Sequence, residues 1–95
     1  MGKLDGKVAI ITGGSGGIGK AAAQLFAAEG GKVMLVDIDG DALKGVVSEI
    51  GEENAAHLVA NVADPAESEA FVAAAVERFG GVDIAILNAG IEGQI

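Results

Sequence analysis

The segment that most constrains the fold is residues 8–19, VAIITGGSGGIG, where an apolar run leads directly into a cluster of glycines. A continuous apolar run before the turn favours a strand that is covered on both faces of a sheet. After the turn, apolar residues recur at helical spacing and predict one buried helix face, made of Ile18, Ala21, Ala22, Leu25 and Phe26. Such a helix aims its first N–H groups and its positive dipole end at the turn, where a pyrophosphate is the usual occupant.

The glycines fit a phosphate-binding turn in two registers, GSGGIG over residues 14–19 and TGGSGGIG over residues 12–19. One glycine must turn sharply out of the strand, one must let the backbone approach the phosphates, and one must let the helix pack closely. Because glycine makes up 16 of the 95 residues, the pattern alone also fits a merely flexible loop. Its position between a strand and a helix favours the phosphate site.

The rest of the chain alternates strands and helices that end at glycines. We expect strands at 7–12, 32–36, 56–60 and 83–88, and helices at 17–29, 40–50 and 65–79. The buried faces predicted for the second and third helices comprise Leu43, Val46, Val47 and Ile50, and Val72, Ala75, Val76 and Phe79. Asp64, Pro65 and Glu67 are typical of the start of the third helix.

This alternation predicts an α/β fold: a truncated, Rossmann-like, doubly wound parallel sheet with four strands in the order 3-2-1-4 and three helices. The first two helices should cover one face of the sheet and the third helix the other. Residues 1–95 would form a single partial dinucleotide-binding domain, with the ligand crevice where strands one and four diverge.

An acidic residue, Asp37, stands at the end of the second expected strand. In a dinucleotide site an acid about 20 residues beyond the glycines accepts hydrogen bonds from ribose hydroxyls. It also repels a 2′-phosphate and therefore favours NAD over NADP. Alternatively, Asp37 only ends a strand and opens a turn, as we expect for Asp39 and Asp41.

Composition excludes several classes of function. The net charge of −8 argues against nucleic acid or an anionic membrane as a partner. There are no cysteines, no long apolar run and no signal peptide, so a cytoplasmic location is the default expectation. No metal site is expected, because nothing near the single histidine, His57, has metal-ligand spacing. The apolar content of 51% is high for so short a chain and predicts that a partner covers part of it.

With these motifs in order, the chain resembles the amino-terminal part of the short-chain dehydrogenase/reductase family. Residues 12–19 match that family's Thr-Gly-x-x-x-Gly-x-Gly turn, which favours the longer register. Asp37 matches its NAD-selecting acid, and Asn88-Ala89-Gly90 matches the end of its Asn-Asn-Ala-Gly motif. Two positions differ from the pattern: Leu87 stands where that motif usually begins, and Asn61 stands where an Asp commonly contacts adenine.

The resemblance implies NAD as the cofactor, held by its ADP-ribose half. The implied cofactor-binding residues are Gly13, Ser15, Gly17, Ile18, Gly19, Asp37, Asn61, Val62, Asn88, Ala89 and Gly90. The family's proton relay uses a Tyr and a Lys four residues apart with a Ser and an Asn, and this sequence contains no tyrosine. We therefore expect no catalytic residues in this chain and no enzymatic activity of its own.

An alternative hypothesis is a self-associating structural fragment that binds no nucleotide. The fourth expected strand, with Ile84, Ile86 and Leu87, would be an uncovered apolar edge that recruits another strand. Two copies could then form one eight-stranded sheet with two-fold symmetry. We expect a homo-oligomer under either hypothesis. A third hypothesis is that the chain is a piece of an intact NAD-dependent oxidoreductase that acts on an alcohol or a ketone.

Overall fold

The computed structural model describes residues 2–13, 17–60 and 68–87. Strands β1 (Val8–Thr12), β2 (Lys32–Asp37), β3 (Ala55–Val59) and β4 (Ile84–Leu87) alternate with helices α1 (Gly17–Ala28), α2 (Gly40–Ile50) and α3 (Ser68–Phe79). All neighbouring strands are parallel, in the order β3-β2-β1-β4. The predicted fold class and strand order are therefore confirmed. The expected start of the third helix at residues 64–67 lies outside the described residues.

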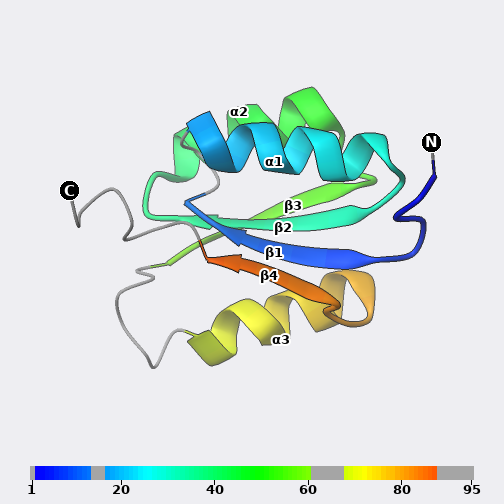
Figure 1. The fold of residues 1–95 in the computed structure, drawn as a ribbon. Coiled ribbons are helices and arrows are strands. Elements are labelled where there is room, and N and C mark those ends of the chain that lie inside the picture. The colour runs from blue at the N-terminus through cyan, green and yellow to red at the C-terminus, as the bar shows by residue number, and fades with distance from the viewer. Residues whose placement is uncertain (1, 14–16, 61–67, 88–95) are drawn as a thin grey trace.

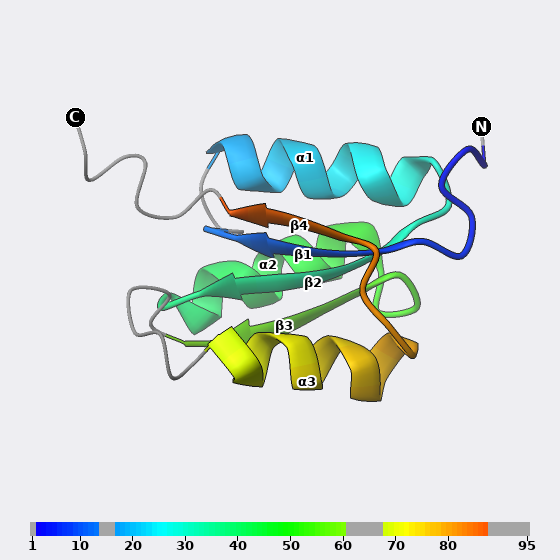
Figure 2. The same ribbon diagram turned by 60° about the horizontal axis from the view of Figure 1, so that its bottom comes forward.

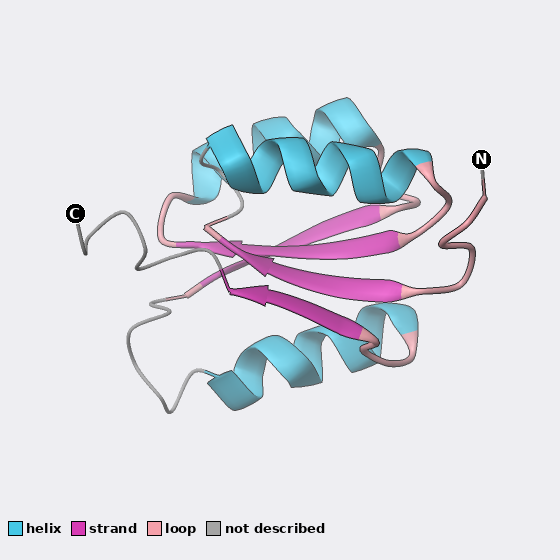
Figure 3. Cartoon of the chain, viewed as in Figure 1, coloured by secondary structure: helices cyan, strands magenta, loops and turns pink. Residues whose placement is uncertain are grey.

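The layers follow from the burial of the central strands. Helices α1 and α2 cover one face of the sheet and α3 covers the other (Figure 1). Figure 2 shows α3 on its own side of the sheet, and Figure 3 shows the resulting helix–strand–helix sandwich. All five residues of β1 are buried, as are the four central residues of β2. A parallel strand with helices on both faces needs apolar side chains on both, which explains the continuous apolar runs.

Two core clusters lie on the two sides of the sheet. Beneath α1 and α2, the buried cluster includes Ile11, Leu35 and Leu43. Beneath α3, Ile10, Met34 and Phe71 belong to the other cluster. Neighbouring residues of each strand therefore serve opposite cores, as the two-residue period of a strand requires.

The predicted buried face is correct for α2 and wrong in part for the other two helices. In α2, Leu43, Val46 and Val47 are buried and Ile50 is partly buried. In α1 the buried residues are Gly19, Ala23 and Phe26, whereas Ile18, Ala21 and Leu25 are exposed. In α3, Phe71 and Ala75 are buried, Phe79 is partly buried, and Val72 and Val76 are exposed.

The difference between the predicted and the observed buried side of α1 has a physical cause. Small residues at Gly19 and Ala23 face the sheet and permit a close approach of helix and strands. Lys20, on the adjacent face, forms an ion pair with Glu49 of α2 at 3.1 Å. The larger Ile18 and Leu25 are thereby turned away from both the sheet and α2.

The ends of α2 match the prediction because both are capped. Asp39 precedes the helix in an extended conformation, and its Oδ1 accepts a hydrogen bond from the Ala42 N–H at 3.1 Å. At the other end, Gly51 adopts a φ of 109° and donates its N–H to the Val47 carbonyl at 2.7 Å. Because glycine takes this conformation readily, the helix stops there.

Burial predicts the effect of a substitution in α2. Replacement of the fully buried Leu43 by alanine removes core side-chain atoms without a helix-propensity cost and should lower the free energy of unfolding by about 2–5 kcal/mol. The matched control is Lys44→Ala at the exposed neighbouring position, which should change it by less than about 0.5 kcal/mol. Urea denaturation followed by circular dichroism measures both. Equal midpoints for the two variants would show that α2 does not pack as described.

Candidate functional site

The carboxyl ends of all four strands lie at one edge of the sheet. Thr12 pairs with Val36 on one side and with Leu87 on the other, and Asp37 pairs with Val59. The amino end of α1 lies at the same edge (Figure 1). In open α/β sheets ligands bind outside the carboxyl ends of the strands where the strand order reverses, which here is between β1 and β4.

The first residue after β1 turns the chain sharply. Gly13 has a φ of 69°, a left-handed conformation that favours glycine, and donates its N–H to the Val36 carbonyl at 2.7 Å. This is the tight turn that the sequence predicted. The hydrogen bond also fixes the start of the glycine-rich turn against the end of β2.

The amino end of α1 carries three of the predicted site residues. Gly17 is exposed, and a Cβ added there would meet nothing within 4 Å. Gly17 also lacks the positive φ of Gly13, so neither its backbone conformation nor the packing of the described residues requires a glycine. Gly19 is buried, which permits the close helix–sheet approach, and Ile18 is 71% exposed.

The electrostatics of the three helix starts differ. The first turn of α1 contains no acidic residue, whereas α2 has Asp41 and α3 has Glu69 in their first turns. Acidic side chains near a helix start occupy its positive end and its unpaired N–H groups. The first turn of α1 therefore carries no acidic side chain that would compete with an external anion.

Asp37 lies beside this turn. Gly13 is bonded to Val36, the residue directly before Asp37, so the structure brings the two predicted positions together. The Asp37 Oδ1 accepts the N–H of Ile38 at 2.7 Å, and its main-chain carbonyl accepts the Ala60 N–H at 3.0 Å. The side chain is half-buried at the strand end. These contacts fix the carboxylate at the edge that carries the helix start.

The remaining predicted site residues cannot be placed. Ser15, Asn61, Val62, Asn88, Ala89 and Gly90 lie outside the described residues. Their roles therefore stay predictions. The described part of the site consists of Gly13, Gly17, Ile18, Gly19 and Asp37.

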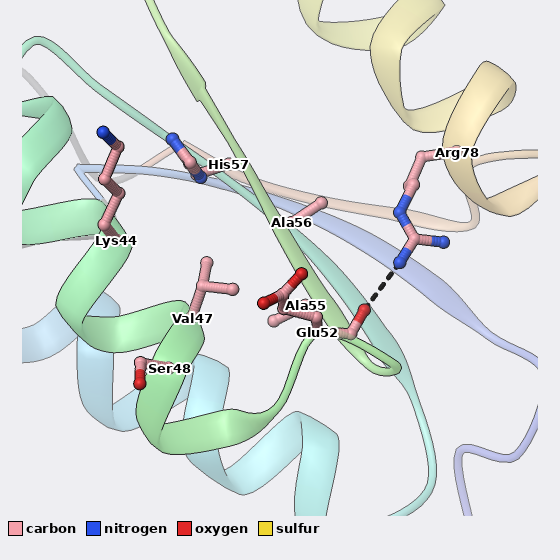
Figure 4. Close-up of a pocket in the computed structure, with 8 residues that line it drawn as sticks. All are labelled: Lys44, Val47, Ser48, Glu52, Ala55, Ala56, His57 and Arg78. Carbon is pink, nitrogen blue, oxygen red and sulfur yellow. Dashed lines mark hydrogen bonds between the residues drawn. The ribbon is translucent and has the colours of Figure 1, made fainter.

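A hollow of about 360 Å³ lies elsewhere, beside the outer edge of β3 (Figure 4). It is lined by Lys44, Val47, Ser48, Glu52, Ala55, Ala56, His57 and Arg78. Arg78 reaches from α3 and donates from Nη2 to the Glu52 carbonyl at 2.6 Å, while its guanidinium lies 4.9 Å from the Phe79 ring centroid. His57 is half-buried in the middle of β3. No sequence motif indicated this hollow, because its lining comes from three separate elements.

Residues 2–13, 17–60 and 68–87 contain neither a candidate metal site nor a candidate membrane-spanning helix. No group of three or more His, Cys, Asp or Glu side chains there could hold a metal ion. Over the same ranges, none of the helices has both the length and the apolar character needed to cross a membrane.

Comparison with known proteins identifies the fold family. A family model for short chain dehydrogenases matches residues 7–95. Levodione reductase from Leifsonia aquatica is 42% identical over 92 residues, which cover 93% of this chain and 34% of that protein. Momilactone A synthase from Oryza sativa subsp. japonica is 40% identical over 91 residues, covering 96% and 33% respectively.

Solved structures agree with the sequence matches. The 3-ketoacyl-(acyl-carrier-protein) reductase from Brucella melitensis, complexed with NADH, superposes with a TM-score of 0.82 at 42% identity, covering 87% of this chain and 34% of that one. Glucose dehydrogenase of Caenorhabditis elegans in its apo form gives a TM-score of 0.86 at 36% identity, covering 97% and 41%.

The chain spans about a third of the length of the curated relatives that it matches. The matched part nevertheless includes nearly all of the chain, and its structural neighbours have the Rossmann fold. The family resemblance drawn from the glycine turn and Asp37 is thereby confirmed. The chain belongs to the short-chain dehydrogenase family.

Proposed function

We propose that this chain forms the ADP-ribose-binding half of a nicotinamide cofactor site, with NAD preferred over NADP. The observation that carries the proposal is the meeting of three features at one sheet edge: the Gly13 turn, the acid-free start of α1 and the Asp37 carboxylate. A family neighbour of known structure is complexed with NADH, which supports the same ligand class.

The pyrophosphate would lie against the start of α1. Its negative charge meets the unpaired N–H groups and the positive end of the helix dipole. The chain as a whole is acidic, so long-range attraction does not contribute and local donors must hold the anion. The open space at Gly17 allows the phosphates to approach the backbone without a Cβ between them.

The adenosine ribose would lie at the end of β2. In the proposed site the Asp37 carboxylate accepts hydrogen bonds from both ribose hydroxyls, and its charge repels a 2′-phosphate. Asn61, Val62, Asn88, Ala89 and Gly90 are proposed to surround the adenosine, and Ser15 to line the phosphate turn. In the structural alternative, Asp37 only closes a turn through Ile38. The Asp37→Ala variant described below distinguishes this alternative from the ribose-binding role.

The cofactor, when bound, supplies hydride transfer chemistry. This chain's residues contribute binding and orientation of the nucleotide half. We propose no catalytic residue within the chain. The proton relay that the family resemblance implies uses a Tyr–Lys pair, and the sequence has no tyrosine. For a longer protein built on this segment we propose oxidoreduction of an alcohol or a ketone, consistent with relatives such as levodione reductase.

Gly17→Ala separates folding from binding. A Cβ at Gly17 meets no described atom within 4 Å, so the free energy of unfolding should stay the same or rise by up to about 1 kcal/mol. The same Cβ would obstruct the pyrophosphate. The Kd for NAD should therefore rise roughly tenfold or more, which corresponds to a loss of about 1.4 kcal/mol of binding free energy. Isothermal calorimetry and urea denaturation measure the two effects.

The matched control for Gly17 is Gly45→Ala in α2. That position is also exposed and has nothing within 4 Å of an added Cβ, but it lies outside the proposed site. It should gain stability and bind NAD as the unmodified chain does. Equal NAD affinity in both variants would remove the start of α1 from the site.

Asp37→Ala tests the ribose contact. Loss of hydrogen bonds to a charged acceptor should raise the Kd for NAD roughly 10–100-fold, while the ratio of NADP to NAD affinity increases. Asp41→Ala makes the same change of charge at an exposed position in the first turn of α2 and should leave NAD binding unchanged. If both variants weaken NAD binding equally, or neither does, Asp37 has only its turn-closing role.

A further inference from the structure

The hollow beside the outer edge of β3 is lined by ionisable side chains of both signs. It has a volume of about 360 Å³, within the range of about 300–1,000 Å³ that small-molecule pockets occupy. Lys44, Glu52 and His57 contribute ionisable groups to its lining. Within residues 2–13, 17–60 and 68–87, no hydrogen bond or ion pair engages any of these three side chains. Their polar ends can therefore bind an external molecule.

The position of the hollow does not depend on β4. All of its lining residues belong to α2, β3, α3 and the turn between α2 and β3. Strand β3 lies at the opposite edge of the sheet from β4. In a doubly wound sheet with the strand order 3-2-1-4-5-6, strand 3 is the outermost strand and further strands add beside strand 4. The hollow is therefore a feature of the described elements themselves.

The sheet register places His57 on the face that α2 covers. His57 pairs with Leu35, whose side chain belongs to the core cluster beneath α1 and α2. Lys44 and Val47 are three residues apart in α2 and therefore share one side of that helix. Figure 4 shows the Lys44 ammonium and the His57 ring at the same end of the hollow. Two nitrogen groups from different elements thus border one end.

The carboxylate of Glu52 lies apart from these nitrogen groups. Glu52 follows α2 in the turn that leads to β3, and its main-chain carbonyl accepts the 2.6 Å hydrogen bond from Arg78. That bond anchors the main chain of the turn and does not involve the carboxylate. In Figure 4, Val47 lies between the Lys44 ammonium and the Glu52 carboxylate. No ion pair joins Lys44 to Glu52 in the described structure, so the hollow has a cationic end and a separate anionic group.

The floor between the two charged groups is apolar. Val47 and Ala55 line the hollow with only 6% and 1% of their surfaces exposed. Their tight packing in the core cluster beneath α2 makes this floor a fixed surface. An apolar segment of a ligand can lie on it without leaving a buried polar group unpaired.

A second hollow shows a different arrangement of polar groups. It has a volume of about 240 Å³, and its lining includes Glu49 and Asn54. Glu49 pairs with Lys20 at 3.1 Å, and the Asn54 Oδ1 accepts a hydrogen bond from the Lys32 Nζ at 2.7 Å. There the polar groups already have partners within the chain, whereas the opposite charges beside β3 are held apart.

We propose that the hollow beside β3 binds a small zwitterion with an apolar middle. The Lys44 ammonium and an N–H of the His57 ring hold its anionic group, and the Glu52 carboxylate holds its cationic group. The apolar middle lies on Val47 and Ala55. In a chain of net charge −8, a ligand without net charge avoids the general repulsion that an anion meets. The ω-amino carboxylates are the simplest molecules of this class.

Titration of the full chain with γ-aminobutyrate, 6-aminohexanoate and 8-aminooctanoate tests the proposal, because these probes differ only in the length of the methylene chain. Amide NMR spectra follow binding residue by residue, and at least one probe should cause saturable shifts within residues 44–57. The carboxylate and the amine of the same length, each with one charge, should bind roughly two- to fivefold more weakly, because each loses one exposed ion pair. No saturable shift there with any probe, or equal affinity for the singly charged analogues, would overturn the proposal.

Substitutions test the polarity of the site. Lys44→Gln and Glu52→Gln should each raise the Kd of the best zwitterion roughly two- to fivefold. The matched controls Lys7→Gln and Glu53→Gln, at exposed positions outside the hollow, should leave it unchanged. Lys44→Glu should weaken binding further, and the added change Glu52→Lys should recover most of the loss by reversing the ligand.

Equal effects of the site and control substitutions, or no recovery in the charge-swapped chain, would contradict a two-ended site. All of these assays omit nucleotide, and none of the substituted residues belongs to the proposed NAD site. Their outcome is therefore independent of the proposed function.

Discussion

Burial of β1 on both faces is the constraint on which the rest of the structure depends. Its five buried residues require a strand on each side and a helix layer above and below. Parallel pairing then brings the ends of β1, β2 and β4 to one edge, with Thr12 between Val36 and Leu87. The glycine turn, the start of α1 and Asp37 meet there as a consequence of this register. The candidate site is thus a product of sheet geometry rather than of a separate binding loop.

Much of this arrangement follows from the sequence. Apolar runs and glycine stops predicted the four strands and three helices, and Asp39 with Gly51 marked the ends of α2. Gly13 and Asp37 could be assigned to one edge because the carboxyl ends of parallel strands meet. The roles of Asn61, Val62 and residues 88–90 stay predictions, since those residues lie outside the described structure.

Helical periodicity misassigned the buried sides of α1 and α3 for a physical reason. Both helices carry apolar residues over more than one side, and periodicity cannot tell which side meets the sheet. In α1 the small Gly19 and Ala23 face the core, while Ile18 and Leu25 are exposed.

The local charge distribution distinguishes the start of α1 from the rest of the chain. The chain carries a net charge of −8, yet the first turn of α1 contains no acidic residue. This absence of acidic side chains suits an anion in the proposed crevice.

Calorimetric titration of the unmodified chain with NAD, and with NADP for comparison, tests the central claim most directly. The account predicts saturable heat with NAD and weaker binding of NADP. Absence of saturable heat with either nucleotide, from a chain that circular dichroism shows to be folded, would contradict it. The chain would then be a folding and assembly unit without a nucleotide site.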